Sequence, residues 1–323
     1  MQLRSEDRSR GQVIIVAALV IAAIFVGLAL VLNSGIYAEN LSSRETTDTD
    51  GALSFTLATD ETIAEAYERT NSANESDASG AETTFNDTMD SWESAQQRRG
   101  AMQGIGIDVE HTAHVGWRLE QDSNRNFTSN SRTVDWKPVD GASGVGAFAM
   151  EVTQSELYDP STPNDVTNSF RVRVSNSSED WDLYVFQNGT DVVVHSGDPA
   201  TQSDMASLFG DDGTCRGGAT SAVVNFTNES LAGANCDALN FSDDLNGSVS
   251  ISFDNSESVE GTYNLVVNGS NAVDTTDFDD PNSGNPTAQA VVYSVSYASH
   301  YEKADMTYER RGTHAVREET YAS

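Results

Sequence analysis

From Gly104 onward, apolar and polar side chains of this chain alternate one by one over about 15 residues. A two-residue period is that of a β-strand with one buried face. The apolar set that would share this face is Ile105, Ile107, Val109, Ala113, Val115, Trp117 and Leu119. Shorter runs follow at 147–152, 170–174, 181–186, 192–194, 223–226, 249–253, 263–267, 291–297 and 306–308. Gly, Asn, Asp and Ser separate them, with a hairpin signal at Asn188-Gly189, so we expect an antiparallel β-sandwich or barrel over residues 103–312.

A different pattern occupies residues 13–32, which contain no charged or polar side chain. As a helix this run would span about 30 Å, the thickness of the hydrocarbon core of a bilayer. Arg4, Arg8 and Arg10 precede it, so the positive-inside rule predicts that residues 1–11 stay in the cytoplasm and the rest lies outside. We therefore expect a transmembrane helix at 12–33 and a single-pass protein of the cell membrane, with the lipid bilayer as a partner. A cleaved secretory signal peptide is the alternative, although its apolar region is normally shorter.

Two helical patterns lie between this run and the alternating region. Ile63, Ala66 and Tyr67 have helical spacing, and so do Phe85, Met89 and Trp92, whereas 45–51 ends in the breaker Asp-Gly and 70–84 is polar. We expect a helical stalk over 34–102 in which the Met and aromatic stripe packs between helices. The complete prediction is an α+β chain with a polar tail at 313–323.

The residues around the apolar run carry a more specific signal. Arg10-Gly11-Gln12 stands directly before it, giving RGQVIIVAALVIAAIFVGLALVLNSG. This resembles the class III signal peptides of archaeal type IV pilins and archaellins. The resemblance implies that a prepilin-type peptidase cuts between Gly11 and Gln12, and that the freed helix packs among other pilin-like subunits. It covers about 25 residues and departs from the bacterial pattern, which has Glu where this chain has Val16.

Similar starts occur in pilus-associated single-pass proteins and in uncharacterised surface proteins of salt-loving archaea, so the match does not choose among these classes. A simpler explanation of Arg8 and Arg10 is that they follow the positive-inside rule alone.

Charge restricts the partners of the chain. It has 50 Asp and Glu against 18 Lys and Arg, a formal net charge of −32. Such a surface would repel nucleic acid and anionic lipid headgroups. Because 37% of the residues are hydrophobic, a core is still expected. At about 1 M salt the Debye length is roughly 3 Å, so a dense carboxylate surface is tolerated, and we expect a halophilic protein.

Two further features fit an exterior location. Cys215 and Cys236 are the two cysteines of the chain, and we favour a disulfide between them over two buried thiols. The Asn-x-Ser/Thr sequons exceed the number expected by chance and are candidate glycosylation sites. They are Asn40, Asn74, Asn86, Asn126, Asn176, Asn188, Asn225, Asn228, Asn240, Asn246 and Asn268.

Motifs that imitate chemical sites fail on inspection. His111 and His114 would point to opposite faces of a strand, which disfavours a metal site. The acidic loop with Asp274, Asp277, Asp279 and Asp280 does not match an EF-hand, although a nonstandard calcium site stays an alternative.

Gly144-Val-Gly146 imitates a dinucleotide fingerprint but precedes a strand-like stretch instead of a helix. We therefore expect no catalytic, cofactor-binding or metal residues and no cofactor. The function predicted is a non-enzymatic archaeal cell-surface protein, a pilin-like or pilus-associated subunit for adhesion or envelope structure. The alternative is a permanently anchored envelope or binding protein that does not polymerise.

The acidic composition predicts dependence on salt. Lowering the salt well below 1 M should restore carboxylate repulsion and unfold the chain, which loss of its far-UV circular dichroism would report. Full retention of the spectrum in dilute buffer would contradict a halophilic protein.

Overall fold

The fold consists of two antiparallel β-sheets and two long helices, in a computed structural model that describes residues 25–26, 50–218, 220–241, 245, 247–281, 283–304 and 306–315. Of these residues, 44% lie in strands and 28% in helices, so the protein is mostly β. The helices are residues 50–71, α2 (Ala78–Ala101) and α3 (Met205–Phe209). The short 3-10 helices are η1 (Gln154–Glu156), η2 (Pro163–Asn168), η3 (Pro199–Thr201), η4 (Asp237–Leu239), η5 (Ser256–Ser258) and η6 (Thr275–Asp277).

Sheet A has the strand order β10-β9-β8-β3-β12-β1-β13-β14. Its strands are β1 (Gly106–Asn126), β3 (Gly144–Thr153), β8 (Ser221–Asn225), β9 (Ser230–Leu231), β10 (Ala234–Asn235), β12 (Glu260–Asn268), β13 (Thr287–Lys303) and β14 (Met306–Ala315). Sheet B has the order β2-β11-β4-β5-β6-β7. Its strands are β2 (Trp136–Ala142), β4 (Phe170–Ser175), β5 (Asp180–Asn188), β6 (Asp191–Ser196), β7 (Thr214–Gly217) and β11 (Val249–Asp254).

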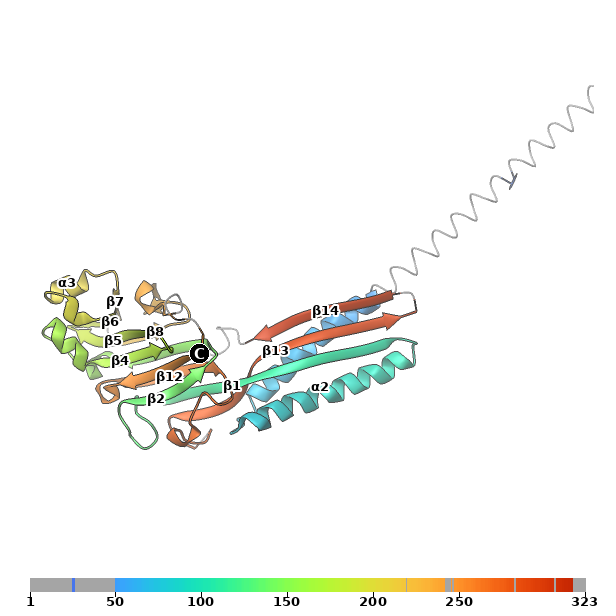
Figure 1. The fold of residues 1–323 in the computed structure, drawn as a ribbon, viewed down its shortest axis with the longest axis horizontal. Coiled ribbons are helices and arrows are strands. Elements are labelled where there is room, and N and C mark those ends of the chain that lie inside the picture. Colours follow the sequence, from blue (N-terminus) through green and yellow to red (C-terminus); the bar gives the residue numbers. More distant parts are fainter. Residues whose placement is uncertain are drawn as a thin grey trace, which may run out of the picture.

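The strands β1 and β13 run through two parts of the molecule (Figure 1). One part, which we call the head, is the sandwich formed by sheet B and the half of sheet A that faces it. The other part, which we call the arm, consists of helix 50–71, α2, residues 106–115 of β1, residues 294–303 of β13, and β14. Both helices and sheet B cover the same face of sheet A, one after the other along β1.

The head has a single large apolar core between its sheets. Trp117 and Trp181 are 4% and 7% exposed and lie in this core, as the alternation predicted. The indole nitrogen of Trp117 donates a hydrogen bond to the carbonyl oxygen of Ser270 at 3.0 Å, which satisfies the one polar atom that its burial removes from water. Asn188 pairs with Asp191 at the end of β5 and β6, so the predicted hairpin is present.

The arm has its own core, in which the helices pack on the alternating face of β1. Phe85 and Met89 are fully buried there, and the Trp92 ring stacks on Phe55 with centroids 6.2 Å apart. The stripe is therefore part of a core as predicted, but it packs on β1 as well as between the helices. On the opposite face of β1, residues 108, 110, 112 and 114 are exposed and polar, so this face of the arm meets solvent.

The junction of arm and head is fixed by Asn71 and the segment that follows it. The side-chain nitrogen of Asn71 donates to the carbonyl oxygen of Val292 at 3.0 Å, and its side-chain oxygen accepts from the Val292 N–H at 2.8 Å. The Ala290 N–H then donates to the carbonyl oxygen of Glu75 at 2.8 Å. Since β14 ends opposite Ser294, residues 71–75 take over the edge of β13 where β14 leaves it.

The expected α+β class with a transmembrane helix and a helical stalk is wrong, because the protein is mostly β. Residues 50–71 and α2 are helical, but they do not form a free-standing stalk. They cover a sheet, since β1, β13 and β14 extend beneath them (Figure 1). The polar tail expected from residue 313 is also displaced, because β14 continues to Ala315.

The expected single-pass location in the cell membrane is corrected as well. Among the described residues, no helix combines the length and the apolar character needed to cross a bilayer. Of the segment 12–33, the structure describes Phe25 and Val26, which are helical and 66% and 62% exposed. The remainder of that segment lies outside the described residues.

The helix boundaries also differ from the pattern. Asp50-Gly51 was expected to break a helix, yet both residues are helical. A Cβ atom at Gly51 would lie 2.8 Å from the hydroxyl of Tyr301, so the glycine permits a close approach of helix and sheet. The expected loop at 70–84 is shorter, because Asp77 caps α2 by accepting from the Gly80 N–H at 2.8 Å.

Replacing the buried Asn71 tests the junction. Asn71→Ala removes the two hydrogen bonds with Val292 and leaves those backbone groups unpaired, so the free energy of unfolding should fall by about 1–3 kcal/mol. Urea unfolding at fixed high salt measures the change. The control is Ser72→Ala next to it, whose exposed hydroxyl bonds only within the helix end and should change stability by less than about 0.5 kcal/mol. Equal effects of the two variants would contradict the role of Asn71.

Candidate functional site

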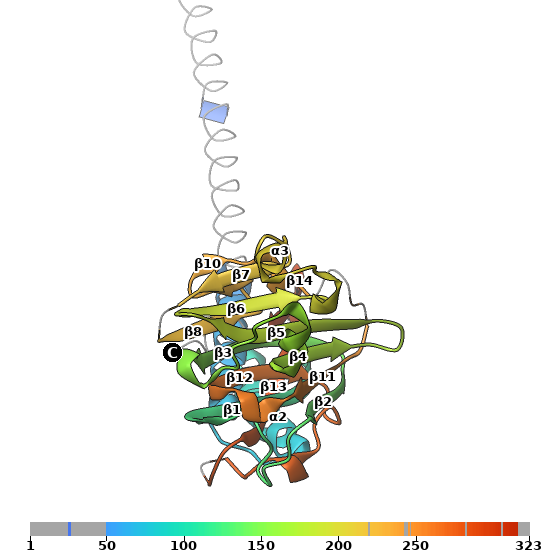
Figure 2. The same cartoon turned by 90° about the vertical axis from the view of Figure 1, so that its left-hand side faces the viewer.

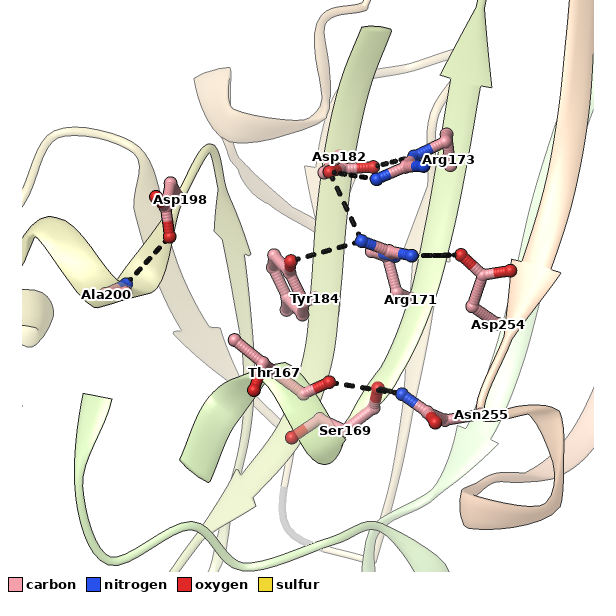
Figure 3. Close-up of polar contacts among 10 residues, drawn as sticks. All are labelled: Thr167, Ser169, Arg171, Arg173, Asp182, Tyr184, Asp198, Ala200, Asp254 and Asn255. Carbon is pink, nitrogen blue, oxygen red and sulfur yellow. Dashed lines mark hydrogen bonds and ion pairs between the residues drawn. The ribbon is translucent and has the colours of Figure 1, made fainter. Parts of the chain in front are cut away.

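The outer face of sheet B carries a network of charged side chains (Figure 3). Arg171 and Arg173 come from β4, Asp182 and Tyr184 from β5, and Asp254 from β11. In each strand the intervening residues point into the head core, as the two-residue period requires. The sequence signal for this network is the Arg-Val-Arg-Val run of β4 in a chain with few basic residues.

The arginines of this network bind carboxylates on neighbouring strands. Arg173 makes two hydrogen bonds to Asp182, at 2.7 and 3.0 Å, and these bonds raise the pKa of Arg173. Arg171 binds Asp254 on the other side and reaches both Asp182 and the Tyr184 hydroxyl at 3.5 Å. The arrangement is a brace across β11, β4 and β5.

A polar row continues this brace across the sheet. Asp254, Arg171, Tyr184, His195 and Thr214 are successive cross-strand partners on five adjacent strands. His195 is 2% exposed, and its Nδ1 lies 2.8 Å from the Thr214 hydroxyl oxygen. Burial lowers the pKa of His195 and favours the neutral ring.

An apolar cover closes the His195 end of the row. Leu208 of α3 and Val166 of η2 pack with Tyr184, Phe186 and Val193 on this face. Seen from the head end, α3 lies beside β7 (Figure 2). His195 is therefore shielded from solvent, and the ion pairs and hydrogen bonds of the network stabilise the sheet.

The structure contains the predicted disulfide between Cys215 and Cys236. Cys215 lies in the edge strand β7, and Cys236 directly precedes η4. The bond ties the edge of sheet B to a segment that follows the edge strand β10 of sheet A, so it joins the two layers of the head. The processing residues Gly11 and Gln12 lie outside the described residues.

The candidate metal residues do not converge. His111 faces the helices, where its ring meets Phe85 at 5.8 Å, whereas His114 is exposed on the other face. In the acidic loop, Asp274 accepts hydrogen bonds from the side chain and backbone of Thr276, which lower the pKa of Asp274. No group of three or more His, Cys, Asp or Glu among the described residues is placed to hold a metal ion.

The glycines of the imitated fingerprint have a packing role. Gly144 and Gly146 lie at the start of β3, so a strand and not a helix follows them, as the sequence predicted. A Cβ atom at Gly146 would lie 2.8 Å from the ring of Tyr293, and one at Gly144 would lie 3.3 Å from its hydroxyl. Both glycines therefore leave room for the side chain of Tyr293.

The hollow over the outer face of the arm is open and shallow. It encloses about 520 Å³ and is lined by residues that include Glu110, Ser296, Tyr297 and Arg311. Substrate pockets are usually concave and mainly apolar with a few convergent polar groups. This hollow has the character of a solvent-facing sheet.

Residues 7–134 match a family of unknown function (DUF7261), which is less than half of the chain. No curated protein and no solved structure matches.

The described sequons differ in the state of their side chains. None of their asparagines is buried, but Asn126 donates its amide hydrogens to the carbonyl oxygens of Glu257 at 2.8 Å and Val259 at 3.1 Å. A glycan replaces one of the two hydrogens on that nitrogen, so at least one of these bonds would be lost. Asn40 and Asn246 lie outside the described residues.

We expect glycosylation of the folded chain to spare Asn126 while modifying exposed sites such as Asn228. Glycopeptide mass spectrometry of the protein purified from its native cells would measure the occupancy of each site. Occupancy at Asn126 equal to that at Asn228 would contradict the expectation.

Proposed function

We propose that this chain is a non-enzymatic structural protein, a pilin-like or pilus-associated subunit whose arm links its N-terminal segment to a displayed head. The observation that carries the proposal is the attachment of helix 50–71 to sheet A. A helix fixed to the sheet in this way transmits tension from the residues before it to the head.

Asp60 is central to this attachment. It accepts a hydrogen bond from the Tyr297 hydroxyl and forms an ion pair with Arg310 at 2.8 Å, so one carboxylate on the helix binds side chains of both β13 and β14. Burial, together with the hydrogen bond to Asp60, raises the pKa of Tyr297 to about 12, so the phenol keeps its proton at ordinary pH. Asn71 provides the second attachment, at the far end of the helix.

The strands continue the connection into the head. β1 and β13 pair from Gly106↔Glu302 in the arm to Glu120↔Thr287 in the head. A ladder of this kind resists extension better than a flexible linker, because many hydrogen bonds share the load. The sequence resemblance at Gly11-Gln12 supports a filament subunit, and the disulfide supports an oxidising compartment.

The chemistry of the described residues also supports a structural role. The guanidinium, imidazole and carboxylate groups that could have suggested catalysis brace strands or cap turns. This is a reason to look for the function in assembly and display.

Mapping of the mature N-terminus tests the pilin-like proposal. We expect intact mass and N-terminal sequencing to show the loss of residues 1–11, and Gly11→Val to block the cut. The control Gly27→Val changes a glycine within the apolar run and should leave processing unchanged. Imaging should then show surface fibres in cells that carry the gene and none in a deletion strain. A mature chain that retains Met1 in cells with active peptidase would contradict the proposal.

A further inference from the structure

Three of the four sheet edges carry features that block a further strand. Sheet A ends on one side at β10, which has two residues, and sheet B ends at β7, which has four. The other edge of sheet B is β2, which contains Lys137 and Pro138 and pairs with β11 through register irregularities. Short strands, lysine, proline and bulges are the usual means of preventing edge-to-edge association.

The fourth edge, β14, has none of these protections. It is 10 residues long, contains no proline, and pairs with β13 in an unbroken register from Ser294↔Ala315 to Lys303↔Met306. Among the described residues, β14 is the last strand of sheet A, and its strand partner is β13. Every second N–H and C=O therefore points away from the sheet, and an edge of this kind is a template for another strand.

We propose that β14 binds β14 of a second copy of this chain, as an antiparallel pair with Arg310 on the two-fold axis. This register places Glu309 of each copy opposite Arg311 of the other. It also places Tyr308 opposite Gly312 on the helix side of the sheet. Opposite residues of an antiparallel pair share a face, so the helices of both copies lie on one side of the joined sheet.

Charge favours this edge over the rest of the surface. A second copy of a chain with a net charge of −32 is repelled by most of the surface, whereas β14 carries two arginines and one glutamate. Glu309 and Arg311 are exposed and pair within the strand at 2.9 Å, so the same groups are able to pair across the axis. Arg310 meets its own copy, but each Arg310 has Asp60 as a counter-ion at 2.8 Å.

The second copy explains why this edge is long and regular and contains no proline, lysine or bulge. The inference does not depend on the proposed filament, because a dimer through β14 forms whether or not the N-terminal segment assembles.

Charge reversal tests the register on the full chain, at the lowest salt that preserves its far-UV circular dichroism. We expect sedimentation equilibrium to show a dimer for the unchanged chain. Arg311→Glu places like charges across the axis and should raise the dissociation constant at least about tenfold. The double variant Glu309→Arg with Arg311→Glu restores complementarity and should restore the dimer. Lys137→Glu makes the same charge change on the β2 edge and should leave the dissociation constant unchanged.

Amide hydrogen exchange locates the interface. We expect β14 to exchange slowly in the dimer and faster in Arg311→Glu, with β1 unchanged in both. A monomer at all concentrations, or association that Arg311→Glu leaves intact, overturns the proposal. If Arg311→Glu fails to fold, the double variant alone decides, because a correctly folded monomer overturns the register. A dimer without surface fibres refutes the filament and leaves this inference standing.

Discussion

Pairing of β1 with β13 joins the arm to the head, and the remaining structure is arranged around that ladder. Its residues run in one register from Gly106↔Glu302 to His114↔Ser294, and then shift by one residue, since Val115 pairs with Val292. Tyr293 is the extra residue at this bulge. A bulge bends a strand and increases its twist, so it marks the place where the sheet stops facing helices and begins to face sheet B.

Two separate cores follow from this one ladder. Val109 of β1 is buried against the helices, and Leu119 of the same face is buried against sheet B. Because β1 and β13 contribute to both cores, the loss of either core would disturb the other. Tyr293 packs with Ala147, Val266 and Val291 on the opposite face, where glycines in β3 make space for its ring.

The local patterns predicted the strands well because burial imposes a period on each strand. The runs at 170–174 and 181–186 became β4 and β5, and the face of Trp117 and Leu119 was assigned correctly. The pattern failed where tertiary contacts decide. Gly51 predicts a helix break from its local sequence, but in the structure it allows the helix to approach Tyr301 closely. The edge strand β2 was not predicted, because it contains Pro138, which disfavours a strand. To predict the brace of Arg171, Arg173 and Asp182, one must know which strands are neighbours in the sheet. The alternation of apolar and polar residues does not give that order. The disulfide could be predicted from the sequence because the chain has two cysteines.

The acidity of the chain affects which parts of its surface can contact another copy. In concentrated salt, screening within about 3 Å removes most long-range repulsion, so contacts are decided by backbone edges, buried apolar area and ion pairs at contact distance. The head closes its edges with short strands, Pro138 and the disulfide. In the arm, Arg310 of β14 pairs with Asp60 of the helix, and Arg311 of β14 pairs with Glu309. At contact distance carboxylates still repel one another, so their excess disfavours close contact elsewhere on the surface and leaves the regular edge of β14 as the place where a second copy pairs.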